Sequence, residues 1–270
     1  MTAPAAAELL ALAVDVAREA AELVARGRAS AGDDVDVKSS PVDVVTAVDM
    51  ASERLVVDRL LGARPDDGVL GEEGADREGT SGVRWVIDPI DGTVNFLYGL
   101  PAYAVSIAAE VEGQVRAGVV LNVATGELFS ATSGGGAHLV GPDQPEPVRL
   151  TGSRPESLEQ SLIATGFGYR VEQRRVQGAV VAALLPRVRD IRRHGSAALE
   201  LCAAAAGRVD GYYELDLKPW DHAAGALIAA EAGLVVAGLA GRPFAEPMAV
   251  AVAPTVAAPF LDLLTELQPL

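Results

Sequence analysis

The sequence is poor in cysteine, lysine and histidine, and it contains no long apolar run that is free of charged residues. Because Cys202 is the single cysteine, a disulfide within the chain is impossible, and the alanines around it predict a buried helical position. A transmembrane helix requires about 20 consecutive apolar residues, and charged side chains interrupt the chain before that length is reached. The sequence therefore indicates neither a disulfide-stabilised fold nor a membrane-spanning helix.

Basic residues are few relative to acidic ones. The 270 residues include 22 Lys and Arg against 37 Asp and Glu, which gives a formal net charge of -15. This charge repels nucleic acids and anionic membranes, so we expect neither as a partner. Residues 4–28 have no basic leader and carry acids among their apolar residues, which predicts an amphipathic helix and not a signal peptide. We therefore expect a cytoplasmic protein, which can act on anions if bound metals supply positive charge.

The first part of the chain mixes helical and strand patterns. Half of all residues are hydrophobic, as in a globular protein. Apolar residues at helical spacing predict helices at 5–25 and 45–61, joined by a loop. Short apolar runs at 69–70 and 85–87 predict strands that end in acids, and alternation over 103–140 predicts an antiparallel sheet.

The segment GPDQPEPV is the best candidate for a boundary, and we divide the chain there into halves 1–145 and 146–270. Patterns in the second half favour helices that alternate with short strands. We expect strands at 162–164 and 188–191, and helices at 171–185, 196–206, 221–232 and 255–267.

The motif DPID places Asp88 and Asp91 three residues apart around Pro89, with no lysine or arginine anywhere in 85–115 to pair with them. Proline fixes the backbone dihedral φ, so we expect a sharp turn after the strand that brings both carboxylates to one side. The Ile90 carbonyl can join them. Such hard oxygen ligands favour Mg²⁺ or Mn²⁺ over zinc. An ordinary turn at a strand end uses the same residues and remains the alternative.

Two neighbouring features strengthen the metal hypothesis. In GEEG, Glu72 and Glu73 end the preceding predicted strand, so at least one can reach the same cluster. After DPID, a helix that begins near Gly92 and Thr93 presents free amides and a positive dipole end to an anion. Divalent metals beside a phosphate site suggest metal-assisted hydrolysis of a phosphate ester.

Two further stretches carry acids at predicted helix starts. Asp221 follows Trp220 in PWDHAAG, where it is either an N-cap or a member of a crowded site. In KSSPVDVVTAVD, which begins at Lys38, Thr46 and Asp49 enter a helix and are either capping residues or part of the same site.

These motifs together resemble those of the inositol monophosphatase family of Mg²⁺-dependent, lithium-sensitive phosphatases. The resemblance rests on DPIDGTVNF from Asp88 to Phe96, and on WDHAAG from Trp220, which continues to EAG at Gly233. The order of GEE, DPIDGT, a Gly-Ser-Ala segment and WD matches the family along nearly the whole chain.

The resemblance implies a set of metal ligands for Mg²⁺, with Mn²⁺ as a substitute, at about two to three positions. Glu72, Asp88 and the Ile90 carbonyl would hold the first ion, and Asp88, Asp91 and Asp221 the second. A third and weaker ion would bind near Glu72.

The resemblance also implies roles toward the substrate, a small phosphate monoester. Glu72, Thr93 and Asp49 take the catalytic positions, with Thr93 and Asp49 as the couple that activates water. The amides of Gly92 and Thr93 would bind phosphate. The alcohol part would meet Asp91, Gly195, Ser196, Ala197, Glu214 and Asp221.

Some residues receive no such role. For Glu214, the alternative is a solvated acid on a turn. Lys218 is not assigned a role: it can contact a second phosphate, or it can only balance the charge of nearby acids. The resemblance implies neither covalent nor histidine-based catalysis, so we interpret His138, His194 and His222 as incidental.

The fold implied is the layered α-β-α-β-α sandwich of the inositol monophosphatase and fructose-1,6-bisphosphatase type. It has an N-terminal α+β half and a C-terminal α/β half that share the active site, and a homodimer is usual. The residues after DGT, with Val94 and not lysine, resemble the inositol monophosphatase branch, so myo-inositol 1-phosphate or a similar polyol phosphate is preferred. Fructose 1,6-bisphosphate and histidinol phosphate are alternatives. A non-catalytic binding or regulatory member is the alternative of another class, which the retention of every costly acid argues against.

Overall fold

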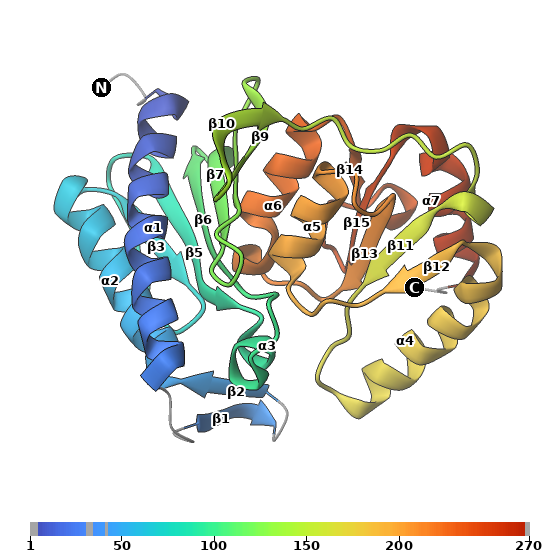
Figure 1. The fold of residues 1–270 in the computed structure, drawn as a ribbon, viewed down its shortest axis with the longest axis horizontal. Coiled ribbons are helices and arrows are strands. Elements are labelled where there is room, and N and C mark those ends of the chain that lie inside the picture. The colour runs from blue at the N-terminus through green and yellow to red at the C-terminus, as the bar shows by residue number, and fades with distance from the viewer. Residues whose placement is uncertain (1–4, 31–34, 41–42, 268–270) are drawn as a thin grey trace.

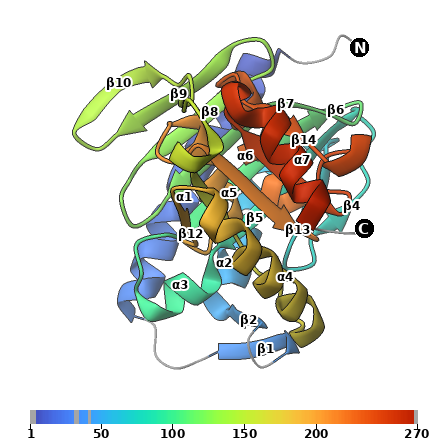
Figure 2. The same cartoon turned by 90° about the vertical axis from the view of Figure 1, so that its right-hand side faces the viewer.

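The computed structural model describes residues 5–30, 35–40 and 43–267. Helices and sheets alternate in the layered order α-β-α-β-α, as predicted (Figure 1). The outer helices are α1 (Ala6–Ser30) and α2 (Ala47–Ala63) on one side, and α4 (Val171–Leu184) and α7 (Ala257–Leu267) on the other. The middle layer consists of α5 (Ala197–Ala205) and α6 (Pro219–Glu231). Figure 2 shows α4 and α7 in front of the second sheet.

The first sheet has eight strands in the order β10-β9-β8-β7-β6-β5-β3-β4. Strands β3 and β5 pair in parallel, and the remaining pairs are antiparallel. The strands are β3 (Gly68–Gly71), β4 (Asp76–Arg77), β5 (Val83–Asp91), β6 (Ala104–Val111), β7 (Gln114–Asn122), β8 (Leu128–Thr132), β9 (Gly136–Gly141) and β10 (Gln144–Arg149).

The central strands β5 and β6 are buried on both faces, and alternate residues of one strand belong to different cores. On β6, Val105 and Ile107 pack in the core that contains α1 and α2. Ala104 and Ala108 of the same strand pack in the core that contains α5 and α6. Side chains of a strand point alternately to opposite faces, so an apolar run such as AVSIAA supplies both cores at once.

The second sheet has five strands in the order β12-β11-β13-β15-β14. Strand β11 runs parallel to β12 and β13, and β15 pairs antiparallel with β13 and β14. The strands are β11 (Leu162–Thr165), β12 (Asp190–Arg192), β13 (Gly211–Leu215), β14 (Val235–Ala237) and β15 (Met248–Val252).

Helix α6 belongs to the second half of the sequence but packs closely on the first sheet. Gly118 of β7 faces it, and a Cβ atom added to Gly118 would lie 2.9 Å from the Ala224 Cα atom and 3.2 Å from the Ala224 carbonyl oxygen. The two halves therefore share the middle helical layer. The division at residue 145 stays a prediction.

We expect Gly118→Val to reduce the free energy of unfolding by about 3 kcal/mol or more, because the nearest atoms are backbone and cannot turn away. Urea denaturation measures this change. Gly62→Ala is the control, since a Cβ atom at Gly62 meets nothing within 4 Å and alanine favours a helix. Equal stability of the Gly118→Val variant and the native protein would contradict this packing.

Most predicted elements are confirmed, with two differences near the site. Part of the segment expected as a loop before α2 forms an antiparallel pair, β1 (Val35–Ser40) and β2 (Asp43–Thr46). This pair lies at the same end of the molecule as α3 (Thr93–Tyr98) (Figures 1 and 2). Strand β5 also continues through Pro89 to Asp91, where we expected it to end at Asp88.

Among the described helices, none is long and apolar enough to cross a membrane.

Candidate active site

One large cavity, of about 1220 Å³, lies where β5 and the first turns of α3, α5 and α6 meet. Its lining contains every residue to which the sequence assigned a metal or substrate role. Asp49 is outside the lining and reaches the site through Thr93. The lining residues with assigned roles are Glu72, Asp88, Ile90, Asp91, Gly92, Thr93, Gly195, Ser196, Ala197, Glu214 and Asp221.

The end of β5 places two acids on one side of the sheet by means of a bulge. Asp88 pairs with Ser106 and Asp91 with Ala104, so three steps along β5 match two steps along β6. In a regular strand, residues three apart point to opposite faces. Because the bulge inserts one extra residue, both carboxylates lie on the same side of the sheet. The predicted convergence is thus achieved inside the strand, and not by a turn after it.

The acids of the cavity repel one another in a buried setting. Burial, followed by the charges of Glu72, Asp91 and Asp221, raises the pKa of Asp88 well above its usual value. Burial also raises the pKa of Asp91 to about 6, although hydrogen bonds from Ser196 and Ala198 oppose the shift. The pKa of Asp221 is raised by burial and then by the charge of Asp91. The site concentrates acidic groups at a partly buried position, where water screens their charges less than at the surface.

This donor set fits a hard divalent cation. The ligands are carboxylates and one strand-end carbonyl, at Ile90, and bound Mg²⁺ would relieve their repulsion. Within the described ranges, however, no three His, Cys, Asp or Glu side chains are grouped as closely as a finished metal site. A side-chain hydrogen bond also joins Glu72 and Asp88.

Asp49 combines the two roles that the sequence left open. One of its oxygens, Oδ2, accepts hydrogen bonds from the Thr46 amide at 2.9 Å and from the Thr46 hydroxyl, which completes a capping box at the start of α2. The other, Oδ1, lies 3.1 Å from the Thr93 hydroxyl, which is also 3.1 Å from the Ile90 carbonyl. Burial raises the pKa of Asp49. The helix cap thereby fixes a carboxylate behind Thr93.

Asp221 is not the N-cap of α6, because the helix begins two residues earlier at Pro219. Its Oδ2 atom accepts a hydrogen bond of 2.6 Å from the Lys218 amide. This contact satisfies one amide before the first turn and fixes the carboxyl group, which lines the cavity. Asp221 thus serves the helix start and the cavity together.

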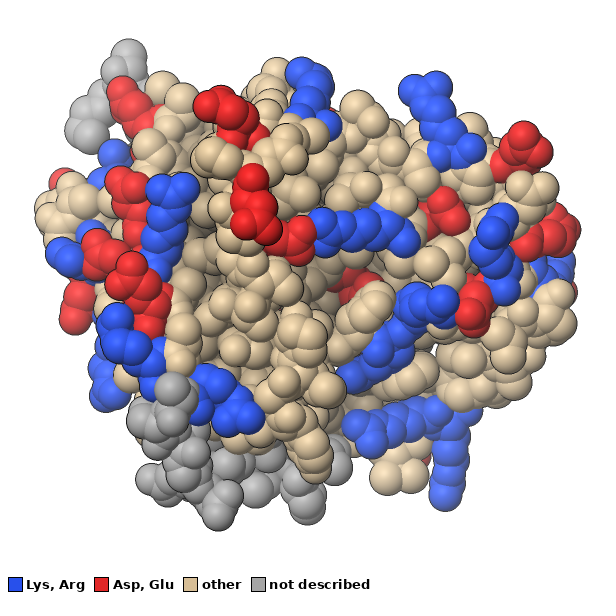
Figure 3. All heavy atoms as spheres, in the orientation of Figure 1, with Lys and Arg blue, Asp and Glu red and all other residues tan. Residues whose placement is uncertain are grey.

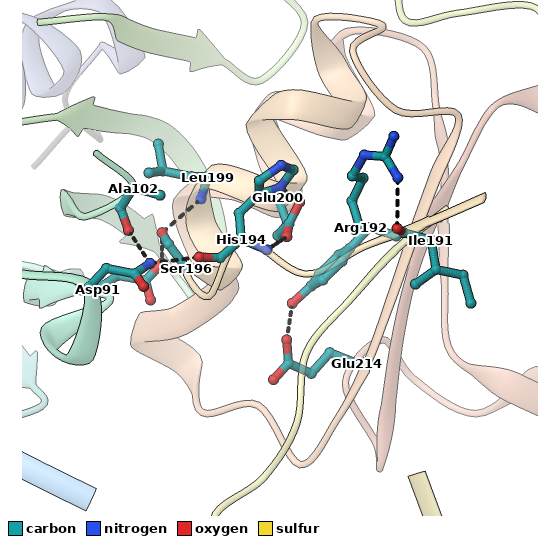
Figure 4. Close-up of polar contacts among 11 residues, drawn as sticks. Asp91, Ala102, Ile191, Arg192, His194, Ser196, Leu199, Glu200 and Glu214 are labelled. Carbon is teal, nitrogen blue, oxygen red and sulfur yellow. Dashed lines mark hydrogen bonds and ion pairs between the residues drawn. The ribbon is translucent and has the colours of Figure 1, made fainter. Parts of the chain in front are cut away.

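Ser196 joins the two halves of the site. Its hydroxyl donates to Asp91 Oδ2 at 2.7 Å (Figure 4). The Ala198 amide donates to the same oxygen at 2.7 Å. The Ser196 oxygen also accepts from the Leu199 amide at 3.3 Å as the N-cap of α5. The start of α5 therefore holds Asp91 in place.

Two positioning residues were not singled out from the sequence. The Asn95 side-chain amide donates to the Ala102 carbonyl at 2.7 Å and to the His194 carbonyl at 2.6 Å, and so ties α3 to the loop before α5. Buried Glu200 accepts from the His194 amide at 2.7 Å and faces its Nδ1 atom at 3.0 Å (Figure 4). That contact raises the pKa of His194. For Glu200, the sequence signal that could have indicated this role is a polar residue inside an otherwise apolar predicted helix.

Glu214 lies in strand β13 and not on a turn. Its Oε2 atom accepts a hydrogen bond of 2.6 Å from the Tyr212 hydroxyl (Figure 4). Burial raises the pKa of Glu214 to about 7 even though this hydrogen bond lowers it. Because Glu214 lies in a strand, accepts this hydrogen bond and lines the cavity, the alternative of a solvated acid on a turn is wrong.

Without divalent cations, we expect the melting temperature to fall as the pH rises from about 4 to about 7. The folded protein keeps a proton on Asp91, whose pKa is about 6, while the unfolded chain releases it near the ordinary value of 3.8. Stability is therefore lost as the pH rises through this window. Calorimetry measures the slope. Asp91→Asn should flatten it, and added Mg²⁺ at pH 8 should restore stability. A pH-independent melting temperature that ignores Mg²⁺ would contradict the shift.

Comparison with known proteins shows the family to which this chain belongs. A model of the inositol monophosphatase family matches residues 5–267. The inositol-1-monophosphatase SuhB of Mycobacterium tuberculosis is 52% identical over 241 residues, which cover 84% of this chain and 82% of that protein. The Nus factor SuhB of Escherichia coli K12 is 40% identical over 235 residues, or 86% of each chain.

Solved structures show the same fold. Mycobacterium tuberculosis SuhB superimposes with a TM-score of 0.85 at 46% identity, over 98% of both chains. The Thermotoga maritima IMPase has a TM-score of 0.86 at 31% identity, over 96% of this chain and 98% of that one. With a family match over nearly its whole length and the same layered fold, this chain belongs to the inositol monophosphatase family.

Proposed function

We propose that the protein is a Mg²⁺-dependent phosphomonoesterase that hydrolyses myo-inositol 1-phosphate or a related polyol phosphate. The observation that carries this proposal is a set of mutually repelling acids around one cavity, of which Asp88 and Asp91 are buried and Glu72 and Asp221 half-buried. The Mg²⁺ ions that they would hold supply positive charge to the phosphoryl oxygens and lower the pKa of water.

The chain's own residues would then orient the reaction. The Thr93 hydroxyl, which lies 3.1 Å from Asp49 Oδ1, accepts the proton of the attacking water while its own proton moves to Asp49. The water oxygen forms a bond to phosphorus, and the bond between phosphorus and the ester oxygen breaks. The leaving alkoxide takes up a proton from solvent, while Asp49 returns its proton to solvent. The amides of Gly92 and Thr93, at the first turn of α3, donate to the phosphate oxygens.

The alcohol part would lie toward the second half. Glu214 and Asp91 accept hydrogen bonds from polyol hydroxyls, and the loop at Gly195, Ser196 and Ala197 contacts the ring. All of these residues line the cavity. This arrangement suits a hydroxyl-rich substrate more than an apolar one.

We also expect a cytoplasmic location, inhibition by lithium and a homodimer.

The test is phosphate release with and without Mg²⁺ from myo-inositol 1-phosphate, fructose 1,6-bisphosphate, histidinol phosphate and 3'-phosphoadenosine 5'-phosphate. We expect Mg²⁺-dependent turnover with the highest kcat/KM on the polyol phosphate. A higher kcat/KM for histidinol phosphate or for 3'-phosphoadenosine 5'-phosphate would indicate that the protein belongs to another branch of the family.

A binding or regulatory role is the second candidate, because relatives at 40% identity carry the name Nus factor. In that case all four substrates would remain intact while the folded protein still bound Mg²⁺.

A further inference from the structure

Helix α2 has a polar inner side that the proposed reaction uses only in part. Asp49, Ser52 and Glu53 are all buried, and residues three and four positions apart share one face of a helix. On its outer side the helix has ordinary surface charges. Figure 3 shows acidic and basic side chains mixed over the left-hand surface, where Figure 1 places α1 and α2. Asp49 has a place in the proposed reaction, whereas the buried Ser52 and Glu53 have none.

Ser52 and Glu53 both contact backbone groups beside the proposed metal ligands. The Ser52 hydroxyl donates to the Pro89 carbonyl at 3.2 Å, inside the bulge of β5. The Glu53 carboxylate reaches the turn that follows β3. Its Oε2 atom accepts a hydrogen bond from the Glu73 amide at 2.8 Å, and its Oε1 atom accepts one from the Ala75 amide at 3.0 Å. Both oxygens of one buried carboxylate therefore hold the same turn.

This turn carries Glu72. The Glu72 amide donates to the Ile87 carbonyl of β5 at 3.2 Å, and a side-chain hydrogen bond joins Glu72 to Asp88. The residue is thus attached to β5 directly, and the turn that continues from it is attached to α2 through Glu53. The position of the Glu72 carboxyl group depends on both attachments.

The Glu53 carboxylate packs tightly against the start of the turn. A Cβ atom added to Gly71 would lie 2.2 Å from Glu53 Oε2 and 2.7 Å from its Cδ atom. The Gly71 amide donates to the Ala75 carbonyl at 2.6 Å and closes the turn around the carboxylate. The first glycine of GEEG therefore leaves room for Glu53.

A carboxylate suits this position better than the amide of glutamine. Both carboxylate oxygens are acceptors, and each faces a backbone N–H donor, whereas a glutamine side chain has one acceptor and one NH₂ donor group. In a Glu53→Gln variant, a donor would face a donor at one of the two contacts. Groups that orient a metal ligand in this way contribute about 10- to 100-fold to metal affinity.

We propose that Glu53 is a positioning residue for Mg²⁺ binding, which acts by holding the turn that presents Glu72 to Asp88. The proposal rests on the proposed function, because it concerns the metal site of the same reaction. Glu53 itself lies outside the cavity lining, so it acts through Glu72 and not by contact with the metal or the substrate.

The experiment is titration calorimetry of the purified protein with Mg²⁺, well below the melting temperature. Glu53→Gln should raise the Kd for Mg²⁺ about tenfold. Glu231→Gln is the matched control, because the Glu231 carboxylate also accepts two backbone hydrogen bonds, from the Gly134 and Gly136 amides at 2.7 and 2.8 Å, but lies outside the cavity lining. It breaks the same kind of contact and should leave the Kd unchanged.

Two further variants separate positioning from the simple loss of a negative charge. In a Glu72→Gln background, Glu53→Gln should have no additional effect on the Kd, whereas an effect of charge alone would persist there. Gly71→Ala keeps the charge of Glu53 but crowds its carboxylate, so it should also raise the Kd. It replaces Glu53→Gln if that variant does not fold.

An unchanged Kd in the Glu53→Gln variant, or an equal increase in the native and Glu72→Gln backgrounds, would overturn the proposal. In the phosphate-release assay, the Mg²⁺ concentration at half-maximal rate should rise as the Kd does, while the rate at saturating Mg²⁺ falls less than about threefold. If no phosphate ester is hydrolysed, the proposed function fails separately, and the Mg²⁺ affinities still decide the role of Glu53.

Discussion

Asp88→Asn is expected to lower Mg²⁺-dependent phosphate release by at least about a thousandfold, because the variant loses a carboxylate assigned to both metal positions. The same change should not harm the fold. Asp88 is buried, and its pKa is raised by burial and by three neighbouring acids, so its charge opposes folding near neutral pH. Without metal, the variant should therefore be as stable as the native protein or more stable.

Phosphate release and thermal unfolding, each with and without Mg²⁺, separate these effects. The increase in melting temperature that Mg²⁺ causes in the native protein should shrink in the variant. Glu146→Gln is the control, because this acid lies on exposed strand β10 away from the cavity. Near-normal turnover by the Asp88→Asn variant would show that Asp88 holds no essential ion.

Thr93→Val is expected to reduce kcat by about a hundredfold while the Mg²⁺-induced rise in melting temperature persists. Valine has nearly the shape of threonine but no hydroxyl, so it removes the contacts at 3.1 Å to Asp49 and to the Ile90 carbonyl. The inner acids Asp88 and Asp91 stay unchanged.

Thr93→Ser is the matched variant for this prediction. It restores a hydroxyl and should recover most of kcat. If the valine variant lost metal stabilisation as well, Thr93 would act by shaping the metal site. If it kept full activity, the proton path through Thr93 and Asp49 would be wrong.

The candidate site could be predicted from the sequence because its residues lie in short local motifs. Asp88 and Asp91 share a strand end, and a proline between two acids without a basic partner is an unusual pattern. The sequence could not reveal how they converge, since the bulge depends on the pairing of β5 with β6. Equally, the position of Asp221 relative to the helix start depends on where α6 begins.

The contacts that hold the site together were beyond sequence patterns for a different reason. The Ser196 hydroxyl reaches Asp91 across 105 residues of sequence, and the Asn95 amide reaches the His194 carbonyl across 99. Such pairs are set by the packing of the middle helical layer between two sheets. The hydrophobic periodicity of one segment does not indicate which distant segment will pack against it.

The most direct test of the account is the release of inorganic phosphate from myo-inositol 1-phosphate by the purified protein, first in EDTA and then with increasing Mg²⁺. The account predicts no release in EDTA and a saturable, Mg²⁺-dependent rate that the Asp88→Asn variant lacks. A rate that is unaffected by EDTA, or a folded and Mg²⁺-bound protein that releases no phosphate, would contradict it.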